Sequence, residues 1–176
     1  ASAYTTDTEG DTTATASAAL DLGGNIRFAD DGPAIPTVTL AEGTEPVALT
    51  SDGGLAGGNF VAAELVGDTN ASATIAAVSF ASAFTIGNQN DYGADGAGST
   101  TISYAVQFAT GFVEGDASGL QTSANAPIYL YENAGIITGS TAATEGAITS
   151  GNTAFTIAVN SSTGVLTLTQ YLPIDH

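Results

Sequence analysis

The chain has 176 residues, 43% of them apolar, so it can bury a core as one domain, alone or with a fragment of a second. Its 18 Asp and Glu residues oppose one basic residue, Arg27, for a net charge of −17, which argues against nucleic-acid binding because phosphate contacts need clustered Lys and Arg. With no cysteine or lysine and with His176 as the single, terminal histidine, thiolate and Schiff-base chemistry are absent and zinc is disfavoured, so we expect no enzyme.

The first elements in chain order are a strand and a stiff connector. "TATASAAL" (13–20) is a β-type run, and "RFADDGPAIP" (27–36) follows it. Pro33 and Pro36 remove two backbone donors and restrict the residues before them, so this stretch is an extended connector rather than a central strand. We therefore separate residues 1–34, which either end a preceding module or supply a strand that completes this one, from a module over 35–176.

The rest of the chain alternates with a period of two, and no helical period of 3.6 competes with it. Strands are predicted at 37–41, 60–66, 79–86, 99–109, 128–132, 154–159 and 165–171. "NSSTG" (160–164) predicts an antiparallel hairpin with Phe155, Ile157 and Val159 on one face, and "ENAG" (132–135) predicts a second hairpin turn. The fold class expected is all-β, an antiparallel β-sandwich with long calcium-binding loops and short helical turns, for example near 116–122.

The loop "NQNDYGADGAG" (88–98) concentrates oxygen atoms between two predicted strands. Carboxylates, amide carbonyls and the backbone carbonyls of glycine-rich turns are the ligands that calcium prefers. No run of about 18 apolar residues is present, so no membrane insertion is expected, and the first residues lack the basic and apolar regions of a signal peptide.

Four motifs, in order, carry a family resemblance. "DTEGDTTATASAALDLGGNIRFADDGP" resembles the junction between tandem modules of giant type I secreted RTX adhesins. "DYGADGAGSTTISYAVQF", "PIYLYENAGIITG" and "AFTIAVNSSTGVLTLTQYLPIDH" resemble successive parts of a repeat domain of the same proteins. The match covers most of residues 27–176. Two departures are Glu9, where the pattern more often has Asp, and the end of the chain after "LPIDH", where the family continues to a further strand.

The resemblance implies a calcium-dependent, extracellular β-sandwich module on the bacterial cell surface, in a protein of cell adhesion and biofilm formation with neighbouring adhesin modules. It also implies a ligand: a cell-surface protein or the C-terminal end of a peptide held through bound Ca²⁺, with a glycan as the alternative. The metal ligands expected are Asp7, Glu9, Asp11, Asp30, Asp31, Asp91, Asp95 and Asp116. The ligand-binding residues expected are Asn88, Gln89, Asn90, Asp91, Tyr92, Asp95 and Ser118.

Each expected site has a structural alternative. Asp7, Glu9 and Asp11 alternate as on the solvated face of a strand, and an Asp before Gly, as in 30–32, often caps a turn. The loop 88–98 also fits a solvated hairpin loop. At the level of function the alternatives are a structural extender rigidified by calcium, a calcium-dependent sugar-binding module and a carbohydrate-active enzyme with two carboxylates.

Overall fold

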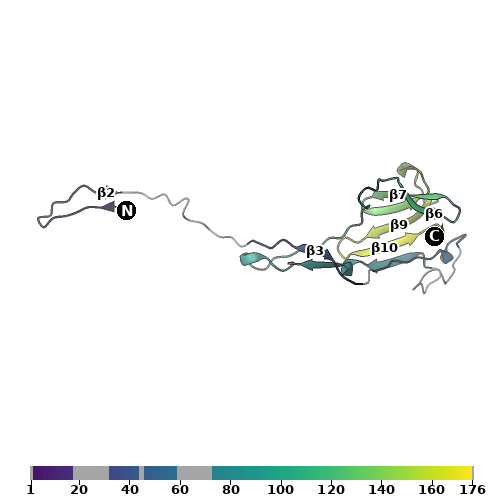
Figure 1. The fold of residues 1–176 in the computed structure, drawn as a ribbon, viewed down its shortest axis with the longest axis horizontal. Coiled ribbons are helices and arrows are strands. Elements are labelled where there is room, and N and C mark those ends of the chain that lie inside the picture. Colours follow the sequence, from purple (N-terminus) through teal and green to yellow (C-terminus); the bar gives the residue numbers. More distant parts are fainter. Residues whose placement is uncertain (1, 18–31, 44–45, 59–72, 176) are drawn as a thin grey trace. The chain divides into compact units, whose positions relative to one another are not determined.

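The computed structural model describes residues 2–17, 32–43, 46–58 and 73–175 (Figure 1). The chain divides into two units, which are described separately: residues 1–34 with 91–97, and residues 35–90 with 98–176. Two sequence predictions, the strand at 60–66 and the end of the strand at 13–20, lie outside the described residues. In the part that the structure describes, no helix is long and apolar enough to cross a membrane.

The first unit contains a β-hairpin. Strands β1 (Ser2–Ala3) and β2 (Ala16–Ser17) pair antiparallel, and an isolated bridge joins Thr6 to Thr12 nearer the turn. A short 3-10 helix, η3 (Gly93–Asp95), lies in the other segment of this unit. The described residues of the hairpin are all exposed, so hydrogen bonds rather than a buried core define it.

The second unit is built on a seven-stranded antiparallel sheet in the order β11-β6-β7-β8-β9-β10-β4, several strands of which are labelled in Figure 1. Its strands are β4 (Ile75–Ser79), β6 (Ala117–Thr122), β7 (Pro127–Asn133), β8 (Ile136–Ser140), β9 (Thr153–Val159), β10 (Val165–Gln170) and β11 (Ile174–Asp175). The prediction of an all-β, antiparallel, sandwich-like fold is confirmed.

The hairpin of β9 and β10 forms as the sequence predicts. Leu166 pairs with Val159 and Leu168 with Ile157, which places these alternating apolar residues on one face. The turn is closed by the side chain of Asn160, whose Oδ1 accepts the N–H groups of Ser162 and Thr163, both at 3.0 Å. The asparagine side chain at the first turn position thus accepts hydrogen bonds from turn N–H groups that have no strand partner.

The second predicted hairpin joins β7 to β8. Asn133 pairs with Ile136, so the loop consists of Ala134 and Gly135, with φ of 51° and 81°. Two consecutive positive φ angles give the backbone the twist that matches a two-residue hairpin. Glu132 adds a bond, since its Oε1 accepts the N–H of Gly135 at 2.7 Å.

A smaller two-stranded ribbon pairs β3 (Thr37–Leu40) with β5 (Phe84–Gly87). The chain leaves β4 at Phe80, passes through the 3-10 helix η2 (Ala81–Ala83) and enters β5 directly. The chain therefore changes its strand partner from β10 to β3 at this kink. The sequence predicted one continuous strand over 79–86, which the 3-10 helix interrupts.

One local prediction is wrong. A helical turn was expected near 116–122, but this stretch is strand β6, whose register with β7 shifts between Ala117 and Gln121. The irregularity, together with Gly119 at φ 86°, breaks the alternation by which a strand is recognised. Short helical turns do occur elsewhere, at η1 (Asp52–Gly54), η2, η3 and η4 (Glu145–Ala147).

Apolar side chains of the large sheet and of the segment after β10 form the core of the second unit. Ile128, Ala154 and Phe155 form its buried centre, and partly buried apolar residues pack around them: Leu130, Ile157, Leu168, Leu172 and Ile174. The ring of Phe155 lies against the backbone of Gly139 on the neighbouring strand. This hydrophobic cluster holds together the C-terminal strands of the second unit.

Candidate functional site

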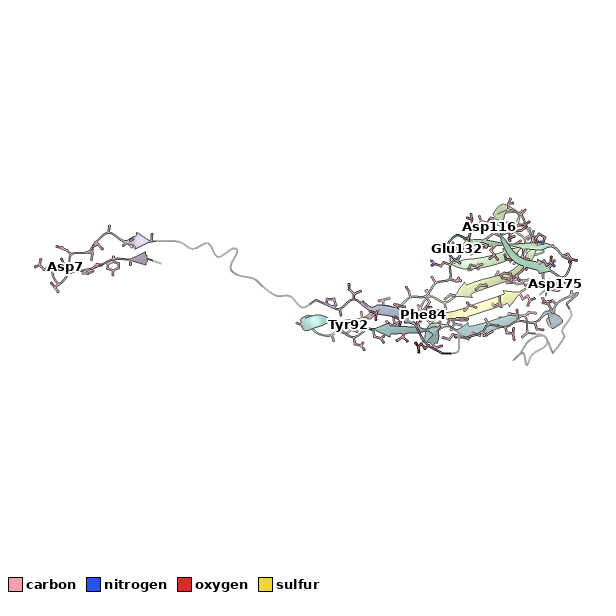
Figure 2. The ribbon with its side chains drawn as sticks, viewed as in Figure 1. Asp7, Phe84, Tyr92, Asp116, Glu132 and Asp175 are labelled. Atoms are coloured by element: carbon pink, nitrogen blue, oxygen red, sulfur yellow. The ribbon has the colours of Figure 1, made fainter. Side chains whose placement is uncertain are left out.

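The acidic stretch at 7–11 forms the tip of the N-terminal hairpin, where Asp7 is labelled in Figure 2. The Oδ1 of Asp7 accepts the N–H of Glu9 at 3.0 Å and that of Asp11 at 2.9 Å. Gly10 adopts φ 94°, which the turn requires and which favours glycine. The three acidic residues therefore surround a turn instead of alternating along a strand, and Asp7 holds the turn closed.

In the loop after β5, two amide side chains donate hydrogen bonds to backbone carbonyls of residues that flank the loop. The Nδ2 of Asn88 donates to the carbonyl of Ile35 at 3.3 Å, and the Nε2 of Gln89 donates to the carbonyl of Ile86 at 3.4 Å. The hydroxyl of Thr100 donates to the carbonyl of Gln89 at 2.5 Å. These bonds anchor the start of the predicted ligand loop to the ends of the strands that flank it.

Residues 91–97 of this loop belong to the first unit. The Oδ1 of Asp91 accepts the N–H of Gly93 at 3.5 Å, and the Asp91 carbonyl accepts the N–H of Ala34 at 3.0 Å. Tyr92 is half-buried and precedes η3, in which Asp95 is the last residue. Asn90 and Tyr92 also have interaction partners in the structure. The predicted metal ligands Asp30 and Asp31 lie outside the described residues.

Asp116 and Ser118, both predicted as site residues, support the start of β6. The Oδ2 of Asp116 accepts the N–H of Val113 at 3.0 Å, and the hydroxyl of Ser118 donates to the carbonyl of Ile128 at 2.9 Å. Beside them the Oε1 of Glu114 accepts the N–H of Glu132 on β7 at 3.1 Å. Of these bonds, the one from Ser118 to Ile128 lies where the register between β6 and β7 shifts, between Ala117 and Gln121.

No three His, Cys, Asp or Glu side chains among the described residues lie close enough together to hold a metal ion. Asp7, Asp91 and Asp116 each direct one carboxylate oxygen to backbone N–H groups, which leaves the second oxygen to offer a metal. The donor chemistry thus fits calcium, whose shell takes backbone carbonyls and water besides carboxylates. Every charged side chain in the described residues is acidic, because Arg27 and His176 lie outside them.

One important carboxylate was not singled out from the sequence. Asp52, in the 3-10 helix η1, accepts the side-chain N–H of buried Gln170 and, through Oδ2 at 3.1 Å, the backbone N–H of Ile174. Ser51 caps the same turn, since its hydroxyl oxygen accepts the N–H of Gly53 at 3.3 Å. The Ser-Asp-Gly sequence predicts such a turn, but not its partners more than 100 residues away.

Tyr131 is the described group with a perturbed acidity. It is 3% exposed, and its hydroxyl donates to the carbonyl of Ala142 at 2.7 Å. Burial raises the pKa of the Tyr131 phenol, and the charges of Tyr129, Glu114 and Glu145 raise it further. Tyr131 is thus a packed, buried residue with a satisfied hydroxyl.

Comparison with known proteins gives one match. The model of a family described as a domain of unknown function, DUF5801, matches residues 63–176. Neither the curated proteins nor the solved structures contain a match to this chain.

Proposed function

The chain belongs to the DUF5801 family, and we propose that it is a calcium-dependent ligand-binding module of a bacterial surface adhesin, acting outside the cell beside neighbouring modules. The observation that carries the proposal is electrostatic: the chain has a net charge of −17, and the described residues include no basic side chain. Within the part of the chain that the structure describes, the carboxylates of Asp7, Asp91 and Asp116 accept backbone N–H groups and have no basic side chain as a countercharge. A divalent cation supplies that countercharge.

Calcium is the cation that suits these loops. It accepts six to eight oxygens in irregular geometry, so a loop can contribute backbone carbonyls together with one or two carboxylates. The turns at 7–11 and 88–98 offer both kinds of oxygen, and the family resemblance in the sequence points to the same ion. A cation that binds only the folded chain stabilises it by mass action, by about 2.7 kcal/mol at a hundredfold excess over its dissociation constant.

The ligand we propose is the C-terminal end of a peptide. In so negative a chain a free carboxylate meets repulsion, and a bound calcium reverses the local sign. An irregular calcium shell can leave positions for that carboxylate, while Asn and Gln side chains in the loop 88–95 offer donors and acceptors to a peptide backbone.

Thermal unfolding tests the calcium dependence. The midpoint should rise by about 5–10 °C in excess calcium relative to EGTA at fixed ionic strength, from the stabilisation given above. Magnesium at the same concentration is the control, because it demands a smaller octahedral shell and should stabilise less. Equal midpoints in calcium and EGTA would reject the proposal.

Peptide chemistry tests the ligand. A peptide selected from a library in calcium should lose binding when its C-terminus is amidated, because amidation removes the terminal charge. Asp91→Asn should weaken binding of the free-acid form, whereas Asp175→Asn, on the exposed edge strand β11, should not. Binding that simple sugars abolish would instead support the glycan alternative.

A structural extender is the second candidate, and a specific observation favours it. The side chains of Asn88, Gln89 and Asp91 make hydrogen bonds to backbone groups of the loop itself or of the segments beside it, as those of a loop without a ligand would. An extender predicts the same rise of the unfolding midpoint in calcium, with no peptide or sugar bound. The two experiments together therefore separate the candidates.

A further inference from the structure

Residues 101–108, predicted as a strand, form an extended segment without a strand partner. Ile102, Tyr104, Val106 and Phe108 are half-buried, and the residues between them are exposed, so the side chains alternate as in a β-strand. Within the described residues, no ladder of backbone hydrogen bonds joins this segment to a neighbouring strand. Within the described residues, this segment therefore has backbone groups that are free to pair with a strand.

One edge of the segment is held and the other is open. The N–H of Tyr104 donates to the carbonyl of Ser161 in the β9–β10 turn at 2.9 Å. In an extended chain the backbone groups of successive residues point to opposite edges, so those of Ser103, Ala105 and Gln107 point the other way. Among the described residues these groups have no backbone partner.

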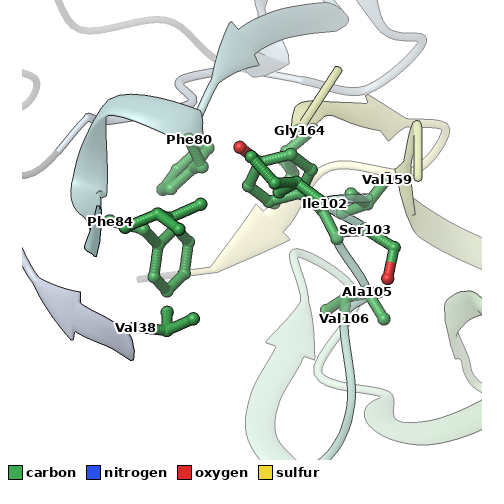
Figure 3. Close-up of a pocket in the computed structure, with 12 residues that line it drawn as sticks. Val38, Phe80, Phe84, Ile102, Ser103, Ala105, Val106, Val159 and Gly164 are labelled. Atoms are coloured by element: carbon green, nitrogen blue, oxygen red, sulfur yellow. The ribbon is translucent and has the colours of Figure 1, made fainter. Parts of the chain in front are cut away.

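An apolar pocket of about 340 Å³ lies beside the segment (Figure 3). Val38 and Phe84 of the β3–β5 ribbon line it together with Ile102 and Tyr104 of the segment, and the ring centroids of Phe84 and Tyr104 are 6.1 Å apart. Leu166 of the large sheet contributes to the same lining. Val38 is 65% exposed and Phe84 39%, so the pocket leaves apolar surface of the ribbon uncovered, where a binding partner can bury it.

We propose that this edge and pocket form a docking site for an extended β-strand of another protein. The incoming strand pairs with the backbone groups of Ser103, Ala105 and Gln107, and its alternate side chains enter the pocket. Main-chain pairing supplies affinity and the pocket selects apolar side chains at every second position.

The charge of the chain determines which strand fits. All charged side chains in the described part are acidic, and a second copy would add another −17 to the complex. The partner strand therefore carries Lys or Arg at its ends and apolar residues at alternate positions between them. Electrostatic attraction of this kind speeds the encounter and disfavours self-association.

This site does not depend on the proposed function. It uses backbone groups and apolar side chains and no metal ion, so it should bind its strand equally in calcium and in EGTA under conditions where the chain is folded. If thermal unfolding showed no effect of calcium, the proposed function would fail, but the proposal of a strand-docking site would not be affected.

The test uses the whole chain and a synthetic peptide in which valine alternates with threonine between pairs of lysines, amidated at its C-terminus. Titration calorimetry should show saturable binding of one peptide per chain. Hydrogen exchange should show that amides of Ser103, Ala105 and Gln107 exchange fast in the free chain and become protected by the peptide. The same peptide with N-methyl groups on the amides of one edge should not bind, since it cannot form the ladder.

Val38→Asp should weaken the binding of this peptide roughly tenfold or more, because a carboxylate in the pocket is desolvated by the incoming side chains. Val47→Asp is the matched control: Val47 is 71% exposed, does not line the pocket, and should leave binding unchanged. Equal binding by both variants overturns the proposal. Slow exchange of these amides in the free chain would also overturn it, because it would show a partner strand within the chain itself. A dimer that sedimentation detects without peptide would overturn it as well.

Discussion

Gly139 and Phe155 pack so closely that Gly139 has no space for a side chain. A Cβ built at Gly139 would lie 2.5 Å from the Phe155 ring, well inside any real contact. Both residues are buried and sit opposite each other in the β8–β9 pairing. The ring thus covers the backbone of a strand at a position where any side chain would displace it.

Gly139→Ala should therefore destabilise the fold by about 1–3 kcal/mol through overpacking. The free energy of unfolding from urea titration measures this. Gly146→Ala is the control, because a Cβ there meets nothing within 4 Å and its φ is not positive, so that variant should be neutral or slightly more stable. Equal stability of the two variants would show that Phe155 does not pack as described.

Tyr131 gives a second prediction at the scale of one residue. Tyr131→Phe leaves the carbonyl of buried Ala142 without its hydrogen bond and should cost about 0.5–1.5 kcal/mol at neutral pH. Because the folded pKa of Tyr131 lies above its unfolded value of 10.0, the protonated phenol favours the folded state. That contribution is complete below pH 10.0 and is lost as the pH rises through the folded pKa.

Absorbance titration of the tyrosines checks the sign of this shift. The parent chain should contain one tyrosine that ionises later than the others, and Tyr131→Phe should remove that late component. If the variant loses an early component instead, then Tyr131 is exposed to solvent and the burial argument is wrong.

Among the elements, the 3-10 helix η1 serves as a tie to the edge of the large sheet. The carboxylate of Asp52 joins Gln170, at the end of β10, to Ile174, the first residue of β11. The same helix packs closely, since a Cβ at Gly58 would lie 2.0 Å from the Asp52 carbonyl oxygen. The edge strand β11 thus depends on a side chain distant in sequence as well as on its pairing with β6.

Asp52→Ala should release this tie and lower the free energy of unfolding by about 1–3 kcal/mol, because donors in a partly buried site lose their acceptor. Hydrogen exchange should rise at β11 before the rest of the sheet. Asp175→Ala, which removes a bond to exposed Gln121, should change stability by less than about 0.5 kcal/mol. A parent-like Asp52→Ala variant would contradict the role of η1.

Elements whose signals are local were predictable from sequence. The β9–β10 hairpin follows from alternating apolar residues and an Asn-led turn, and the β7–β8 hairpin from the two residues Ala134 and Gly135. Strand β6 was missed because a register shift breaks its alternation, and β4 because its alanines give a weak apolar pattern. The small side chains and irregular pairing hide these strands from a search for periodicity.

The candidate sites were less predictable than the fold for a physical reason. Their carboxylates accept backbone N–H groups whose positions depend on the turn, as Asp7 does, and this is not visible in residue spacing. Asp52 has partners that only the folded chain brings near. Composition indicates an abundance of oxygen ligands, whereas their grouping depends on backbone carbonyls contributed by the fold.

For the molecule as a whole, the dominant property is its uncompensated negative charge of −17. Self-repulsion of this size opposes the compact state, and we propose that a bound cation offsets it, in addition to any role in ligand recognition. The central claim is that calcium is this cation.

A crystal structure of the whole chain grown in calcium tests that claim most directly. We predict ions held by six to eight oxygens at about 2.3–2.6 Å, with carboxylates from the turns at 7–11 or 88–98 among them. An ion at 88–98 with an incomplete protein shell would favour the ligand-binding module, and ions at 7–11 alone the extender. Crystals saturated with calcium in which none of these carboxylates contacts an ion would contradict the account.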